Sequence, residues 1–180
     1  MAIGATVLRL EVTLSDVDRG VYESLSLRVA QHPSETRRFL ITRVLAYCLS
    51  YEEGIAFGRG VSASEEPAVW VKDLTGALRV WIEVGNPSAE RLHRAAKAAE
   101  RVVVFTHKDP TLLVREVEKK GVHRAEEIEV YALEPDFLDR IDEATERSGS
   151  WELVRNEGTL YVTVGGTVFE SPLRTVSLGG

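Results

Sequence analysis

The stretch LRVWIEVGNPSAERLHRAAKAAERVVVF, residues 78–105, decides the fold expected for this chain. Residues 78–84 have the composition of a strand, which the turn-forming Gly85-Asn86-Pro87 ends. Residues 88–101 are expected to form a helix that leads directly into the apolar strand 102–105. A strand, a helix and a parallel strand joined over this length are typical of a right-handed βαβ unit.

The segments before this unit complete a longer pattern. Residues 34–51 change to a period of about 3.6 and predict a helix, with Ser34 as its N-cap. Residues 55–59 and 68–73 predict short strands, and the turn 74–77 joins the second of these to the strand of the βαβ unit. The expected core order is therefore αβββαβ.

Both ends of the chain predict further β structure. Residues 6–14 alternate apolar and polar side chains and are expected to form a hairpin with residues 24–29. The remaining predicted elements are a helix at 110–120, a strand at 128–133, a helix at 135–148, and antiparallel hairpins from Trp151 onward. The expected fold class is mixed α/β, with an αβββαβ core, an N-terminal β-hairpin and a C-terminal antiparallel β extension.

Composition limits the class of protein. A chain of 180 residues, 44% hydrophobic and 28% charged, suits one domain covering residues 1–180. The only cysteine, Cys48, lies among apolar residues and predicts a core position rather than a disulfide or a cysteine metal site. The first residues lack the pattern of a signal peptide, and no apolar run is long enough to span a bilayer. We therefore expect a cytoplasmic protein without a membrane partner.

The charge distribution bears on nucleic-acid binding. The net charge of −6 argues against non-specific binding of nucleic acid, because such binding depends on lysine and arginine side chains that neutralise phosphates. Between Glu35 and Arg101, however, ten basic residues slightly outnumber nine acidic ones. Phosphate contacts, if the protein makes them, are expected from this middle third.

Four stretches carry a resemblance to a known family. They are HPSET at 32–36, FGRG at 57–60, EEPAVW at 65–70, and residues 78–87 with WIEVG at their centre. In this order and at these spacings they resemble the YaeQ family, from the N-terminus to about residue 135. The resemblance implies a compact variant of the fold of the metal-dependent PD-(D/E)xK nucleases.

Nucleases of this type hold Mg²⁺ or Mn²⁺ with carboxylates from adjacent strands. If residues 74 and 77 close the turn, Ala68 faces Glu83 across the hairpin. Glu66 then lies on the same face as Glu83, with backbones about 7–8 Å apart. The sequence thus predicts a catalytic metal site held by Glu66 and Glu83.

Two other carboxylates could contribute. Asp73 is expected about 16 Å from Glu83, where it would brace the turn rather than bind metal. Glu35 is placed in the first turn of the first helix, where a carboxylate complements the helix dipole. The resemblance implies a second role for Glu35, as catalytic support pointing at the same ion, and both roles are compatible.

The lysine that these nucleases carry two residues after the strand carboxylate is replaced here by Gly85. Basic residues recur instead at spacings of three or four on the following helix, at Arg91, Arg94 and Lys97. Lys97 is the catalytic candidate, because the pKa of a lysine can fall on desolvation. Arg94 is the candidate phosphate contact, because arginine stays charged. A solvated helix face is the alternative for each.

Other side chains have two interpretations. Arg38 and Arg43 on the first helix, together with Arg59, are either surface and ion-pair arginines or a ring of phosphate contacts. Trp70 and Trp81 are expected to pair directly across the hairpin, where packing is the first interpretation and base stacking the second.

The leading hypothesis is a metal-dependent phosphodiesterase acting on DNA or RNA. It assigns Mg²⁺ or Mn²⁺ to Glu66 and Glu83, and phosphate contacts to the arginines and Lys97. The alternative is a catalytically silent nuclease fold that binds nucleic acid or protein, which Gly85 and the acidic net charge favour.

Overall fold

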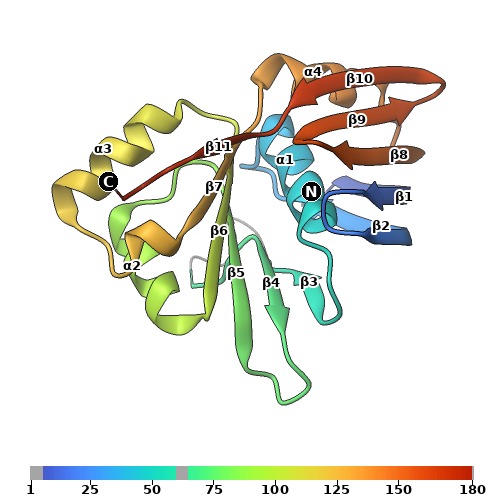
Figure 1. Cartoon of the computed structure of the whole chain (residues 1–180). Helices are drawn as coiled ribbons and strands as arrows, with labels where there is room; N and C mark the ends of the chain where they lie inside the picture. The colour runs from blue at the N-terminus through green and yellow to red at the C-terminus, as the bar shows by residue number, and fades with distance from the viewer. Residues whose placement is uncertain (1–5, 60–64, 180) are drawn as a thin grey trace.

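The computed structural model describes residues 6–59 and 65–179, which form two mixed sheets and four α-helices (Figure 1). We call them sheet A, with strand order β10-β9-β8-β1-β2, and sheet B, with strand order β11-β7-β6-β5-β4-β3. The two sheets lie on either side of the first helix (Figure 1).

Sheet A joins the two ends of the chain. The predicted N-terminal hairpin is confirmed, but its strands are longer than predicted: it pairs Thr6 with Gln31 and continues without a break to Asp16 and Val21. The tail forms the predicted antiparallel hairpins, but its first strand also pairs in parallel with β1, which the sequence did not reveal. The strands are β1 (Thr6–Asp16), β2 (Val21–Gln31), β8 (Ser148–Asn156), β9 (Thr159–Val164) and β10 (Thr167–Pro172).

Sheet B holds the predicted βαβ unit. β5 and β6 are parallel and adjacent, and β7 continues the parallel set. β3, β4 and β5 form an antiparallel meander, and the short β11 closes the other edge beside β7. The strands are β3 (Ile55–Phe57), β4 (Val69–Lys72), β5 (Leu78–Val84), β6 (Arg101–Thr106), β7 (Glu129–Ala132) and β11 (Arg174–Val176).

The helices cover both sheets. α1 packs against strands β3 to β6 of sheet B, α4 packs against α1 and sheet A, and α2 and α3 cover the other face of sheet B (Figure 1). The order helix, three strands, helix, strand is therefore confirmed. The helices are α1 (Arg37–Leu49), α2 (Ala89–Ala98), α3 (Pro110–Lys120) and α4 (Pro135–Ala144), with a 3₁₀ turn at Ala125–Glu127.

Helix boundaries differ from the prediction in α1, α2 and α4. α1 ends at Leu49 rather than residue 51, and α2 ends at Ala98 rather than Arg101, because Arg101 already belongs to β6. The N-cap of α1 is Thr36, whose hydroxyl accepts the Phe39 N–H, so the predicted cap at Ser34 is wrong. Ser34 instead hydrogen bonds with His32 in the preceding turn. α4 ends at Ala144, because the residues that follow enter sheet A.

The apolar strand β6 shows why both faces of sheet B are covered. Val103 and Phe105 face α1, and Val102 and Val104 face α2 and α3. A strand buried on both faces has no polar face, which is why residues 102–105 show no alternation. Cys48 is fully buried in α1, as predicted.

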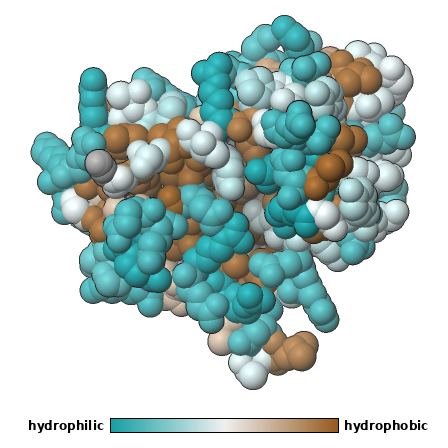
Figure 2. Space-filling model, viewed as in Figure 1, coloured by the Kyte–Doolittle hydropathy of each residue, from teal (hydrophilic) through white to brown (hydrophobic). Residues whose placement is uncertain are grey.

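The outer surface is mixed, with hydrophilic residues and small apolar patches on the face in view (Figure 2). The large apolar side chains that the described residues expose are single and scattered, such as Leu74 at the β4–β5 turn and Val168 on β10. No helix in residues 6–59 and 65–179 has both the length and the apolar character needed to cross a bilayer.

Close backbone packing beside β4 gives a first prediction. A Cβ added to Gly58 would lie 2.0 Å from the carbonyl oxygen of Pro67, so Gly58→Ala must displace the backbone. We expect a loss of about 1–3 kcal/mol in the free energy of unfolding, measured by urea denaturation. Gly149→Ala is the control, because its Cβ would approach no atom closer than 3.6 Å. Equal stabilities of the two variants would contradict this packing.

Candidate functional site

Glu83 is the central carboxylate of the candidate site. It lies near the end of β5, is 5% exposed, and faces α2 rather than α1. Its Oε1 accepts hydrogen bonds from Trp81 Nε1 at 2.5 Å and from Arg91 Nε at 2.8 Å. Burial raises the pKa of Glu83, and the positive charge of Arg91 opposes that rise.

Glu66 precedes β4 and is held by a different arginine. Its carboxylate accepts hydrogen bonds from the backbone N–H of Arg59 at 3.0 Å and from Arg59 Nε at 3.1 Å. These bonds lower the pKa of Glu66. Arg91 Nη2 donates to the carbonyl oxygen of Glu66 at 2.5 Å, so one guanidinium connects Glu83 with the backbone at Glu66.

The register on which the Glu83 prediction depended is confirmed from Val69 to Val71, but it shifts by one residue at Lys72, which pairs with Leu78. Val69 pairs with Ile82 and Trp70 with Trp81, so the residue opposite Glu83 is the one before Val69, as expected. Trp81 is buried, and the ammonium group of Lys72 lies 3.7 Å from the Trp70 ring centre. Packing therefore accounts for both tryptophans, which was the first interpretation.

Charges of opposite sign alternate around this part of the molecule. Arg59 pairs with Glu66, Arg91 with Glu83, and Arg94 with Glu65 at 3.0 Å. The Arg91–Glu83 pair is largely shielded, and Glu66 is partly shielded although its partner Arg59 is exposed. The side chains of Arg94 and Glu65 are both exposed. The site thus combines three carboxylates and three guanidinium groups.

The basic residue nearest Glu83 is Arg91, in the first turn of α2. Arg94 and Lys97 were the favoured substitutes for the missing lysine, but Arg94 contacts Glu65, and Lys97 is exposed further along α2. A helix that leaves the sheet beside Glu83 carries its later turns away from that carboxylate, which explains the difference. Gly85 has φ +87°, a conformation that disfavours any other residue there, including a lysine.

Glu35 lies elsewhere. It precedes the N-cap of α1, so its predicted place in the first helical turn is wrong. Its carboxylate is buried and makes two contacts of 3.0 Å with the guanidinium of Arg43, and it accepts the N–H of His32. Burial raises the pKa of Glu35, and Arg43 opposes that rise. Arg43 lies over Phe57 on the α1 face, so Glu35 and Glu83 approach sheet B from opposite faces.

The other arginines do not converge on Glu83. Arg38 forms a bidentate pair with Asp139 of α4 at 2.8 and 2.7 Å, and Arg43 is buried with Glu35. Of the three arginines predicted to form a ring, only Arg59 lies beside the Glu66 carboxylate.

Asp73 has the structural role predicted for it. Its Oδ1 accepts hydrogen bonds from the backbone N–H groups of Thr75 and Ala77 and from the Thr75 hydroxyl. These bonds lower the pKa of Asp73 and close the β4–β5 turn. Among the described residues, no three His, Cys, Asp or Glu side chains are grouped as a metal site would require.

Sequence reasoning missed His107. Its imidazole follows β6, is 7% exposed, and packs edge-on against Phe39 at 6.3 Å. Burial, with Lys108 and Arg38 nearby, lowers its pKa to about 4. The only signal in the sequence was its position at the end of a buried strand, which many structural histidines share.

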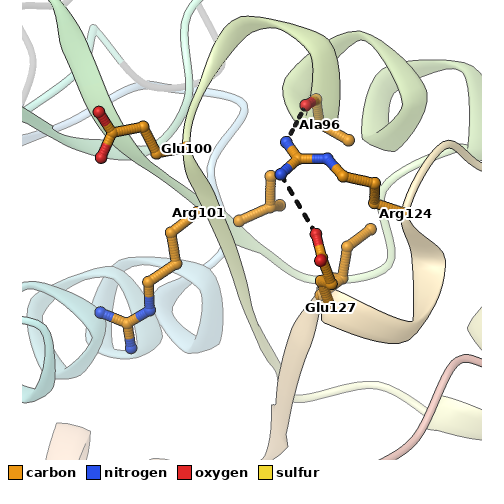
Figure 3. Close-up of a pocket in the computed structure, with 7 residues that line it drawn as sticks. Ala96, Glu100, Arg101, Arg124 and Glu127 are labelled. Atoms are coloured by element: carbon orange, nitrogen blue, oxygen red, sulfur yellow. Dashed lines mark hydrogen bonds and ion pairs between the residues drawn. The ribbon is translucent and has the colours of Figure 1, made fainter.

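A separate hollow of about 330 Å³ lies below α2 and is lined by Arg101, Arg124 and Glu127 (Figure 3). Arg124 points toward Ala96 and Glu127, and its guanidinium caps the last carbonyl groups of α2 (Figure 3). Arg101 is bound to Glu129. Arg101, Arg124 and Glu127 therefore form contacts that stabilise the fold.

The fold and the site define a mixed α/β protein with paired carboxylates and arginines at the ends of two neighbouring strands. The chain belongs to the YaeQ family, because the family model described as YaeQ protein matches residues 1–173. The match extends well beyond residue 135, where the sequence resemblance had been expected to weaken.

Known proteins agree with this membership. The chain is 28% identical to the uncharacterized protein YaeQ of Escherichia coli (strain K12) and 27% identical to that of Salmonella typhi, each over 165 residues and 91% of both chains. The crystal structure of YaeQ protein from Pseudomonas syringae superimposes with a TM-score of 0.86 at 34% identity, covering 98% of this chain and 97% of that one. YaeQ protein from Xanthomonas axonopodis pv. citri also gives 0.86, at 28% identity, covering 96% and 97%.

The pairing of Arg91 with Glu83 leads to a second prediction. Arg91→Met should lower the free energy of unfolding by about 3 kcal/mol, because it leaves a buried carboxylate without its charge partner. The double variant Arg91→Met with Glu83→Gln should lose much less than the sum of the single variants, by about 1 kcal/mol or more. Urea denaturation of the four proteins measures this coupling, and additive losses would contradict it.

His107 leads to a third prediction. Its pKa of about 4 in the folded protein lies below the ordinary 6.5, so the unfolded chain binds more protons between these values. Stability should therefore fall as the pH drops from about 6.5 to about 4, by up to roughly 1.4 kcal/mol per pH unit. Urea denaturation across this range should show a smaller slope for His107→Phe, whereas replacement of the exposed His123 should leave the slope unchanged.

Proposed function

We propose that this chain is a nuclease-like phosphodiesterase that acts on DNA or RNA with Mg²⁺ or Mn²⁺ at the ends of β4 and β5. The observation that carries the proposal is the pair Glu66, just before β4, and Glu83, on the neighbouring β5, with Arg91 bound to the Glu83 carboxylate and to the Glu66 carbonyl oxygen. The consecutive order β3-β4-β5-β6 in sheet B, with α1 before it and α2 within it, supports a restriction-endonuclease-like core.

The carboxylate oxygens of Glu66 and Glu83 are donor atoms of the type that divalent cations prefer. Mg²⁺ is commonly held by one or two protein carboxylates, with waters and phosphate oxygens completing its coordination. Glu83 is buried with a raised pKa, a costly arrangement that often marks a functional group. The guanidinium of Arg91 already supplies a positive charge beside this carboxylate. A bound metal ion would activate water and stabilise charge on the phosphoryl group.

The arginines of the site could bind the phosphate oxygens of a phosphodiester. Arg91 and Arg59 each contact a carboxylate, and both are planar groups suited to phosphate oxygens. A cation held by Glu66 and Glu83 would weaken the attraction of these carboxylates for the two arginines, whose guanidinium groups would then suit phosphate oxygens. Cation and phosphodiester binding should therefore strengthen each other.

A fourth prediction tests the cation site. Calorimetric titration with Mn²⁺ should show saturable binding, and Glu83→Gln or Glu66→Gln should weaken it at least about tenfold, since each removes a charged oxygen ligand. Glu152→Gln is the control, because Glu152 is exposed on β8 of the other sheet. Equal Mn²⁺ affinity in all four proteins would remove these carboxylates from the proposal.

A second measurement uses Arg91→Met, which lacks the guanidinium group beside Glu83. In this variant a cation is free to replace the missing guanidinium, so Mn²⁺ should raise its melting temperature more than that of the wild-type protein. Cleavage of single- and double-stranded DNA and RNA is then assayed with Mn²⁺ present. The absence of both Mn²⁺ binding and a Mn²⁺-dependent rise in melting temperature would reject the metal-dependent enzyme.

Gly85 favours a second candidate, a silent nuclease fold that binds nucleic acid without cutting it. The φ of +87° makes this backbone position suited to glycine, and Arg91 cannot move protons as a lysine can because it stays charged. Binding of oligonucleotides that Arg91→Met weakens, with no cleavage at any Mn²⁺ concentration, would favour this candidate.

A further inference from the structure

A second hollow, of about 480 Å³, lies between the start of α1 and the loop that follows β6. Thr36 and Phe39 line it from α1, and His107 and Lys108 line it from the loop. Phe39 and His107 touch edge-on, so the two walls are packed together. The hollow lies on the α1 side of sheet B, whereas Glu83 faces α2.

The start of α1 brings hydrogen-bond donors to this hollow. The first N–H groups of a helix have no acceptor within it, and the Thr36 hydroxyl accepts only that of Phe39. The 13 residues of α1 also direct the positive end of the helix dipole toward this place. A helix start alone is common, and a second feature is needed to indicate a ligand.

His107 is that second feature. Its side chain is more than nine-tenths buried, yet Nδ1 has no hydrogen-bond partner in the described part of the chain. A buried polar atom left unpaired costs about 1–3 kcal/mol, so such atoms are rare unless a ligand or water completes them. The His107 ring lines the hollow, and an uncharged imidazole can donate one hydrogen bond from a ring nitrogen.

Lys108 adds a positive charge to the wall of the hollow. Its side chain makes no ion pair with any described residue, and its backbone N–H is fixed by the Thr106 hydroxyl at 3.1 Å. The acidic neighbour in the wall, Glu35, is compensated by the two contacts from Arg43. Arg38, also in the wall, is balanced by Asp139. The hollow is therefore left with the charge of Lys108 and the field of α1.

We propose that this hollow binds a phosphate group, with the first turn of α1, His107 and Lys108 as its donors. These donors come from two segments, the start of α1 and the loop after β6, and together they suit the several oxygens of a tetrahedral anion. The site is distinct from the carboxylate site at Glu83 and does not depend on the proposed nuclease function.

The test is calorimetric titration with inorganic phosphate at pH 7 and constant ionic strength set with chloride. Wild-type protein should bind saturably, and Lys108→Ala should weaken binding by about 10- to 100-fold, the value of a charge-assisted hydrogen bond. Lys119→Ala, in the last turn of α3, is the matched control and should change affinity less than about twofold. His107→Phe keeps a ring against Phe39 and should also weaken binding.

Nuclear magnetic resonance gives a readout that does not depend on any variant folding. The ring signals of His107 should shift with phosphate and remain unchanged with an equal ionic strength of chloride. No saturable binding, or equal affinity in wild-type protein and Lys108→Ala, would overturn the proposal. Loss of binding in Arg91→Met with retention in Lys108→Ala would also overturn it, because the anion would then lie at the other site.

Oligonucleotides separate the two sources of such a phosphate. A short strand with a terminal phosphate and the same strand without it are titrated in parallel. If the terminal phosphate tightens binding and Lys108→Ala removes that advantage, the hollow accepts the end of a nucleic acid. If the two strands bind equally while inorganic phosphate still saturates the hollow, the ligand is a small phosphorylated compound.

Discussion

Helix α1 must be covered on every side, and the rest of the fold follows from that constraint. Nine of its residues are buried, including polar Thr42 and charged Arg43. Sheet B covers one side, and sheet A and α4 cover the other, so apolar residues of both sheets share one core. Arg43 is tolerated there because Glu35 balances its charge and its Nη2 donates to Glu35 and to the carbonyl oxygen of Ala30. An uncovered helix of this kind would expose a continuous apolar surface.

This arrangement also decides where polar groups can gather. Because α1 covers one face of sheet B and α2 with α3 cover the other, polar side chains collect where β5 and β6 end. Glu83 meets Arg91 on the α2 face, and His107 meets the start of α1 on the other. The two places use opposite chemistry. At one place the buried carboxylate of Glu83 pairs with the guanidinium of Arg91. At the other, Lys108, which has no ion pair with the described residues, lies beside the unsatisfied imidazole of His107.

The buried carboxylate of Glu83 could be balanced either by a guanidinium group or by a divalent cation. A carboxylate in a low-dielectric place needs a cation beside it, and either a guanidinium or a divalent ion can fill that need. In the structure, the positive charge of Arg91 balances the charge of Glu83. If a metal ion bound Glu83 in its place, as proposed above, Arg91 would keep its hydrogen bond to the Glu66 carbonyl oxygen and lose its charge partner. The same two residues thus connect the silent and the catalytic interpretations of the fold, and the free energy of exchanging the two cations decides between them.

The sequence by itself determined the local elements, because period, turn residues and caps act within a few residues. It predicted the core order αβββαβ, both terminal hairpins, and the register that sets Trp70 opposite Trp81. Tertiary structure alone decided the parallel pairing of β1 with β8, which joins segments about 140 residues apart, and the return of β11 to sheet B. It also decided that Arg91, rather than Lys97, meets Glu83. No local pattern records which turn of a helix faces a given strand end, since that depends on how the helix packs across the sheet.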